Sequence, residues 1–147
     1  MKKIESGFSL IELLVVVAII GILAAVGTVG YGNYIKSSKQ KSLEANVANL
    51  ASAIVTRDGA VAAGVETKLT DFPALIADIK ANSQFKNPYN PADTTVFSAG
   101  SALTGTCTDS NRGQIVFTLA SHALSTTYCL DTGSTVVSGT SATLQAY

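Results

Sequence analysis

Residues able to carry out acid–base, nucleophilic or metal chemistry are few in this sequence. It has one His and two Cys among 147 residues, so a zinc site would have very few donors. His122 has no Ser or Cys constellation near it and is expected as a solvated histidine in a hairpin connection. The Ser38-x-x-Lys41 spacing lacks the companion motifs of an acylating serine enzyme. The mid-chain carboxylates lack EF-hand spacing: Asp58, Glu66, Asp71 and Asp78. We therefore expect no catalytic residue, no metal site, no cofactor and no enzymatic activity.

The charge balance argues against a nucleic-acid-binding protein. The chain has ten Lys and Arg residues and ten Asp and Glu residues, and the sequence pI is about 6.5. Such a chain has no basic field with which to hold phosphates, so no direct nucleic-acid binding is expected. The charged fraction of 14% is below the usual value of about 25%, and the shortfall is concentrated near the N-terminus.

A long apolar run near the N-terminus is the dominant feature of the chain. Residues 13–35 contain no charge, and as an α-helix they would extend about 34 Å. The hydrocarbon core of a bilayer is about 30 Å thick, so this segment is long enough to span it. Tyr31 and Tyr34 fall at its end, where amphipathic aromatic residues suit a membrane interface or packing between helices. A cleaved secretory signal is less consistent with the run, because Glu5 and Glu12 interrupt the approach to it.

The apolar run continues into an amphipathic helical pattern without a break. One helical stripe contains Leu43, Val47, Leu50, Ala51 and Ile54. The spacing predicts a single helix from about residue 9 to about residue 55. We expect its first half to be apolar on all sides, its second half to bury one face against a domain, and Gly59 to cap its end.

Glu12 is the one charge between Phe8 and Ile35. A carboxylate at the centre of a spanning helix costs about 2.5 to 3.5 kcal/mol on insertion scales. Glu12 therefore either remains wet or protonated near the headgroups, or has a partner that compensates its charge.

The string Gly7-Phe8-Ser9-Leu10-Ile11-Glu12 follows a short basic leader and precedes LLVVVAIIGILAAV. Over about its first 45 residues the chain resembles type IV pilins and their pseudopilin relatives. The resemblance implies that residues 1–7 are a leader removed by a prepilin peptidase, with the cut between Gly7 and Phe8, and that Phe8 is then N-methylated. It also divides the rest into a hydrophobic membrane and filament-core segment, 8–35, and an exported domain, 36–147.

The resemblance also implies a partner for Glu12. In filaments of this family the acidic side chain faces the cationic N-terminus of an adjacent subunit, and a pair with the chain's own Phe8 amine is a competing geometry. Family members commonly carry a proline where Val29 stands. Gly21, Gly27 and Gly30 supply flexibility near that place, so local unwinding of the helix in the filament is expected; close helix packing through small residues is the alternative.

The exported domain is expected to be an antiparallel sheet packed on the outer half of the long helix, an α+β fold. A second helix is predicted from residue 71 or 72 to 81, capped by Asp71 and with Pro73 in its first turn. Strands are predicted at 94–98, 114–119, 126–131 and 135–138. Cys107 and Cys129 are either a disulfide, which would place this domain outside the cytoplasm, or two free thiols. In the family that the chain resembles, such a disulfide commonly delimits an exposed loop, so the segment 108–128 is, by resemblance, the candidate for surface or partner contact.

These features favour a structural subunit of a type IV pilus. It would be an inner-membrane prepilin first and part of an extracellular homo-oligomeric helical filament later, with the prepilin peptidase and the pilus assembly machinery as partners. Adhesion, twitching motility and DNA uptake would be activities of the whole fibre. The alternatives are a type II secretion pseudopilin, whose major form usually has a C-terminal calcium loop and no disulfide, and a monomeric membrane-tethered binding module.

Overall fold

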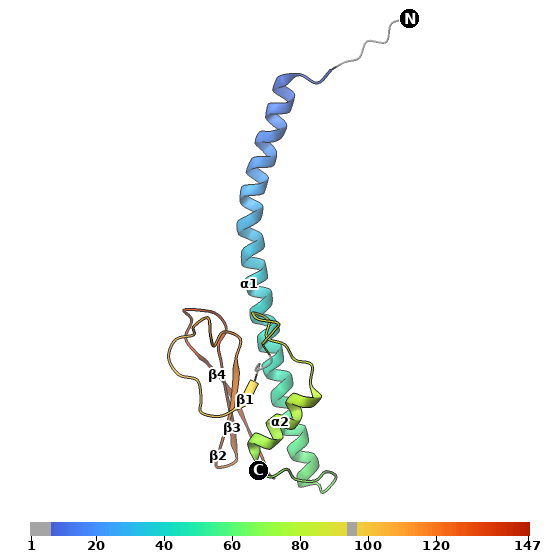
Figure 1. Ribbon diagram of the computed structural model, residues 1–147, viewed down its shortest axis with the longest axis vertical. Coiled ribbons are helices and arrows are strands. Elements are labelled where there is room, and N and C mark those ends of the chain that lie inside the picture. The colour runs from blue at the N-terminus through green and yellow to red at the C-terminus, as the bar shows by residue number, and fades with distance from the viewer. Residues whose placement is uncertain (1–6, 94–96) are drawn as a thin grey trace, which may run out of the picture. The chain divides into compact units, whose positions relative to one another are not determined.

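The computed structural model describes residues 7–93 and 97–147. Its elements are shown in Figure 1: α1 (Leu10–Ala62), α2 (Phe72–Asn82), β1 (Phe97–Ala99), β2 (Ile115–Ala120), β3 (Ala123–Tyr128) and β4 (Val137–Thr143). The chain divides into two compact units, one ending at Ser38 and the other running from Lys39 to Tyr147. Most of the expected leader, and residues 94–96 of the strand expected at 94–98, lie outside the described residues.

Helix α1 ends in a glycine cap, but at a later glycine than the sequence analysis expected. Gly64 has a φ of 73°, a conformation in which glycine is least strained. Its N–H donates to the Val61 carbonyl at 3.0 Å, and the Val65 N–H donates to the Ala60 carbonyl at 2.9 Å. These two bonds form a Schellman motif. The prediction that Gly59 caps the helix is wrong, because Gly59 costs only about 1 kcal/mol inside a helix and the neighbouring Asp58 is held by tertiary hydrogen bonds.

The second half of α1 buries one face. Leu43, Leu50 and Ile54 are fully buried, and Val47 and Ala51 are half-buried against the same core. The predicted apolar stripe is confirmed.

Helix α2 begins and ends close to the predicted positions. Asp71 is its N-cap and accepts a 2.8 Å hydrogen bond from the Ala74 N–H. Pro73 lies in the first turn, where a missing N–H costs nothing. Leu75 and Ile76 are buried, so α2 covers part of the core beside α1.

The four strands form one sheet in the order β1-β2-β3-β4. The β2–β3 and β3–β4 pairs are antiparallel, as predicted, but β1 runs parallel to β2, with Phe97 opposite Ile115. A parallel neighbour needs a long connection, and the loop between Ala99 and Ile115 provides it. The fold is thus a long helix packed on a mostly antiparallel sheet.

A two-residue turn sets the β2–β3 register. Ser121 and His122 have φ values of 49° and 69°, and positive φ at both central residues is the signature of a type I′ hairpin. The turn lets β3 begin at Ala123, three residues before the predicted start at Thr126. Strand β4 lies later in the chain than the strand predicted at 135–138.

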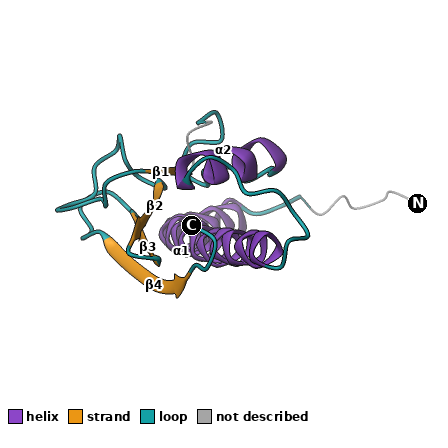
Figure 2. Ribbon diagram, turned by 90° about the horizontal axis from the view of Figure 1, so that it is seen from below, coloured by secondary structure: helices purple, strands orange, loops and turns teal. Residues whose placement is uncertain are grey.

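The core lies between the outer half of α1, α2 and the sheet. Figure 2 shows the strands along one side of α1 and α2 along another. Phe97 and Phe117 meet edge to face, with ring centroids 6.4 Å apart. Their neighbours in this core include Leu124 and Leu144.

A disulfide joins Cys107 to Cys129, with Cα atoms 5.6 Å apart. It ties the loop before β2 to the residue that follows β3, so the disulfide alternative is confirmed. Much of the candidate contact segment 108–128 lies in the sheet, because it contains β2 and β3 and buried residues such as Phe117. Its exposed parts include the loop residues Thr108 to Ser110 and the turn residues Ser121 and His122.

Candidate functional site: the start of the long helix

The expected cleavage site lies in exposed, non-helical backbone. Gly7, Phe8 and Ser9 precede α1, whose first residue is Leu10. The Phe8 side chain is 84% exposed. The peptide bond between Gly7 and Phe8 is therefore outside the helix.

Ser9 and Glu12 form a capping box at the start of α1. The Ser9 N–H and the Ser9 hydroxyl each donate to Glu12 Oε2 at 2.8 Å, and the Glu12 N–H donates to Ser9 Oγ at 3.3 Å. This reciprocal arrangement satisfies two N–H groups that an uncapped helix would leave without partners. Ser9 had no predicted role, although Ser-x-x-Glu before an apolar run is a sequence signal for such a cap.

The Glu12 carboxylate is therefore bound by its own chain in the uncut protein. The alternative pair with Phe8 needs a free amine, and the Phe8 nitrogen is a peptide nitrogen here. Glu12 is exposed, so a neighbouring molecule can reach it.

The first half of α1 and Phe8 before it expose their apolar side chains on all sides. The exposed fractions run from 45% at Val16 to 84% at Phe8. They belong to one continuous surface: Phe8, Leu10, Ile11, Leu13, Leu14, Val15, Val16, Val17, Ile19, Ile20, Ile22, Leu23, Val26, Val29, Tyr31 and Tyr34. A contiguous apolar surface of this size marks a membrane or protein contact. By length and composition, α1 is the one described helix able to cross a membrane.

Gly21, Gly27 and Gly30 all lie inside the continuous helix α1. A side chain added at any of the three would meet no atom within 4 Å. The single chain therefore keeps these residues helical, and unwinding in a filament remains a prediction.

The remaining residues singled out in the sequence do not meet at a reaction site. Ser38 and Lys41 are exposed on α1. His122 is exposed, as expected, but its Nδ1 lies 2.6 Å from the main-chain oxygen of Tyr147, so it makes a specific contact with the last residues. Within residues 7–93 and 97–147, no three His, Cys, Asp or Glu side chains are placed to share a metal ion.

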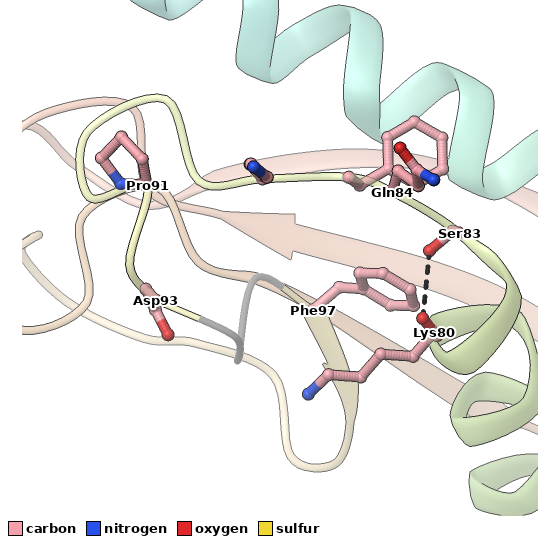
Figure 3. A pocket seen from close by; sticks show the side chains of 8 residues that line it. Lys80, Ser83, Gln84, Pro91, Asp93 and Phe97 are labelled. Carbon is pink, nitrogen blue, oxygen red and sulfur yellow. Dashed lines mark hydrogen bonds between the residues drawn. The ribbon is translucent and has the colours of Figure 1, made fainter.

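A pocket of about 530 Å³ lies beside α2 and is shown in Figure 3. It includes Lys80, Asp93 and Phe97. The Ser83 hydroxyl donates to the Lys80 carbonyl at 3.4 Å on its wall. We assign this pocket no function.

Two cations lie against the Tyr89 ring, at the junction of α1 and the disulfide loop. Lys39 Nζ is 5.7 Å and the Arg112 guanidinium 5.0 Å from the ring centroid. Burial, and next the charge of Asp131, raise the pKa of Tyr89 above its usual value, while Arg112 opposes the shift. Burial likewise raises the pKa of Tyr128. Through the Tyr89 ring, these contacts hold the loop that contains Arg112 against α1, which contains Lys39.

Comparison with known proteins gives one match, at the capped start of α1. The family described as the prokaryotic N-terminal methylation motif matches residues 2–28. The start of the chain therefore carries a prepilin-like methylation motif. No curated protein and no solved structure matches the chain. The matched segment includes Gly7, Phe8, the capping box and the apolar part of α1 up to Thr28.

Proposed function

We propose that this chain is the structural subunit of a type IV pilus. Chains with this motif are typically structural, and one observation carries the assignment: the methylation motif leads directly into a helix whose apolar surface is exposed on every side. Burying a large apolar side chain gains about 1.5 to 3 kcal/mol. Sixteen such side chains can be covered by lipid before assembly and by copies of the same helix afterwards.

The proposed pathway starts in the inner membrane. A prepilin peptidase removes residues 1–7 by cutting between Gly7 and Phe8, and the new N-terminus at Phe8 is methylated. The pilus assembly machinery then draws residues 8–35 into the core of a helical filament at the cell surface, with the domain 36–147 outside. Adhesion, motility or DNA uptake belongs to the assembled fibre.

Glu12 is the proposed register residue of this assembly. The cut gives Phe8 a positive charge, and a carboxylate and an ammonium group attract strongly once water is excluded, although desolvation offsets part of the gain. Glu12 is exposed to a neighbour and would exchange its Ser9 contacts for that amine. Gly21, Gly27 and Gly30 would allow the helix to unwind locally as subunits pack.

The disulfide supports a pilin over a major pseudopilin. It closes a loop across the sheet, and an exported domain in an oxidising compartment keeps such a bond. A type II secretion pseudopilin and a monomeric tethered module remain as outcomes of the test.

The test is the composition of surface fibres from cells that carry Glu12 variants. Fibres of the unmodified chain should begin at methylated Phe8 and contain this chain as the bulk component. Glu12→Ala should leave the protein in the membrane but reduce its incorporation by at least ten-fold. Glu44→Ala, which removes an exposed carboxylate from the outer half of the same helix, is the matched control. Normal fibre yield with Glu12→Ala would remove Glu12 from the mechanism, and uncut solitary molecules would favour a tethered module.

A further inference from the structure

We propose that Ser9 is a positioning residue for processing: by capping α1, it keeps the carbonyl of Gly7 out of the helix and open to the peptidase. The inference rests on the proposed function, in which the chain is cut between Gly7 and Phe8. It assigns a role to a side chain that the proposed assembly does not use.

The hydrogen bonds at the start of α1 show how the helix is stopped. The first helical bond runs from the Leu13 N–H to the Ser9 carbonyl, at 3.3 Å. In a longer helix, the next N–H groups would bond four residues back: Glu12 to the Phe8 carbonyl and Ile11 to the Gly7 carbonyl. The Ser9 hydroxyl accepts the Glu12 N–H in place of Phe8. The helix therefore ends two hydrogen bonds before it would engage the carbonyl of the scissile bond, which belongs to Gly7.

The Glu12 carboxylate makes the second contact of the capping box. Because the Ser9 N–H donates to Glu12 Oε2, the backbone at Ser9 is held in its non-helical conformation. Gly7 and Phe8, which precede Ser9, are also non-helical. Cleavage of a chain segment depends on its backbone being free of regular hydrogen bonds, or on the population of a state in which it is free.

Removal of the Ser9 hydroxyl changes what the helix does at this point. Alanine is the strongest helix former and a poor N-cap. Free N–H groups are also costly in the apolar setting of a membrane. The N–H groups of Ile11 and Glu12 would then recruit the carbonyls of Gly7 and Phe8, and the scissile bond would enter the first turn. The peptidase could then cut only those molecules in which that first turn is open.

The expected effect is a change in apparent binding and not in the chemical step. If only a fraction of the precursor has an open scissile bond, the apparent affinity falls by that fraction. For Ser9→Ala we expect KM for cleavage to rise about five-fold with kcat unchanged, which corresponds to about 1 kcal/mol, the usual size of an N-cap contribution.

The experiment uses the full chain in detergent micelles with a purified prepilin peptidase, and follows the cut by mass spectrometry. Ser9→Thr keeps a capping hydroxyl and should be cut like the unmodified chain. Ser37→Ala, at an exposed serine of the same helix, is the control for loss of a hydroxyl. Glu12→Gln keeps a residue suited to a capping box without the charge, so it should be cut normally and yet fail to assemble. NMR carbonyl shifts should report a helical Gly7 in Ser9→Ala alone.

Each result bears on a different claim. A five-fold rise in KM confined to Ser9→Ala, with a helical Gly7, supports the positioning role. Equal KM values for Ser9→Ala and the unmodified chain, or an equal defect in Ser9→Thr, would overturn it while leaving the proposed function intact. An unmodified chain that is not cut after Gly7 would overturn the proposed function, and the positioning role with it.

Discussion

The carboxylate of Asp58 offers a sharp test of how the end of the chain is held on α1. Asp58 lies in α1 and is 3% exposed. Its two oxygens accept the N–H groups of Gln145 and Ala146 at 2.7 and 2.9 Å. The adjacent Leu144 is buried in the core, so these bonds fix the segment that follows β4.

The size of the effect follows from those two bonds. A hydrogen bond to a charged group contributes about 1.5 to 3 kcal/mol, and an N–H left without a partner adds its own desolvation cost. Because Gln145 is exposed and water can replace part of the loss, we expect Asp58→Ala to lower the free energy of unfolding by about 3 kcal/mol. Asp58→Asn keeps one acceptor oxygen and should lose about half as much.

The assay is urea unfolding of the full chain in a mild detergent, followed by circular dichroism. With a slope of about 2 kcal/mol per M, Asp58→Ala should lower the urea midpoint by about 1.5 M. Amide exchange at Gln145 and Ala146 should rise in parallel. Glu44→Ala, an exposed carboxylate of the same helix, should change stability by less than about 0.5 kcal/mol. A loss below that value for Asp58→Ala, or equal losses for Ala and Asn, would refute the reasoning.

Two further predictions concern the disulfide and the two half-buried tyrosines, Tyr89 and Tyr128. Replacing Cys107 and Cys129 together by Ser opens a loop with a sequence separation of 22 residues and should cost about 3.4 kcal/mol by the loop-entropy relation, measured as a lower urea midpoint; an unchanged midpoint under reductant would contradict it. The pKa values of Tyr89 and Tyr128 are raised chiefly by burial. The folded state therefore binds these protons more tightly than the unfolded state, so their contribution is complete below the ordinary pKa of about 10 and is lost as pH rises through the folded values. Replacing both tyrosines by Phe should flatten the fall of stability above pH 10 and remove the last part of the tyrosinate absorbance titration at 295 nm; an unaltered titration would argue against burial at these sites.

Local signals in the sequence were sufficient for the elements that depend on neighbouring residues. Asp71 and Pro73 predicted the start of α2 because a cap and a first-turn proline act within one turn. The stripe through Leu43, Leu50 and Ile54 predicted the buried face of α1 because helical periodicity is a property of the segment itself. The capping box at Ser9 and Glu12 was equally local and could have been found the same way.

Features that depend on distant residues were not predictable in this manner. The helix was expected to end at Gly59, yet Asp58 beside it binds residues 87 and 88 positions later, and these bonds help the helix continue. The parallel pairing of β1 with β2 depends on how the intervening loop returns the chain. The segment 108–128 was the candidate for surface or partner contact, and only the strand pairing places its two strands in the middle of the sheet.

The amino-acid sequence by itself determined a processing motif, an apolar helix longer than a core needs and a domain able to form a disulfide, because each is written in residue types and short spacings. Only the tertiary structure decided which carbonyls the start of α1 leaves free, where α1 ends and which strands lie side by side. Those outcomes depend on backbone N–H and carbonyl groups that each have more than one available hydrogen-bond partner. Which partner a group takes is decided only when the whole chain is folded.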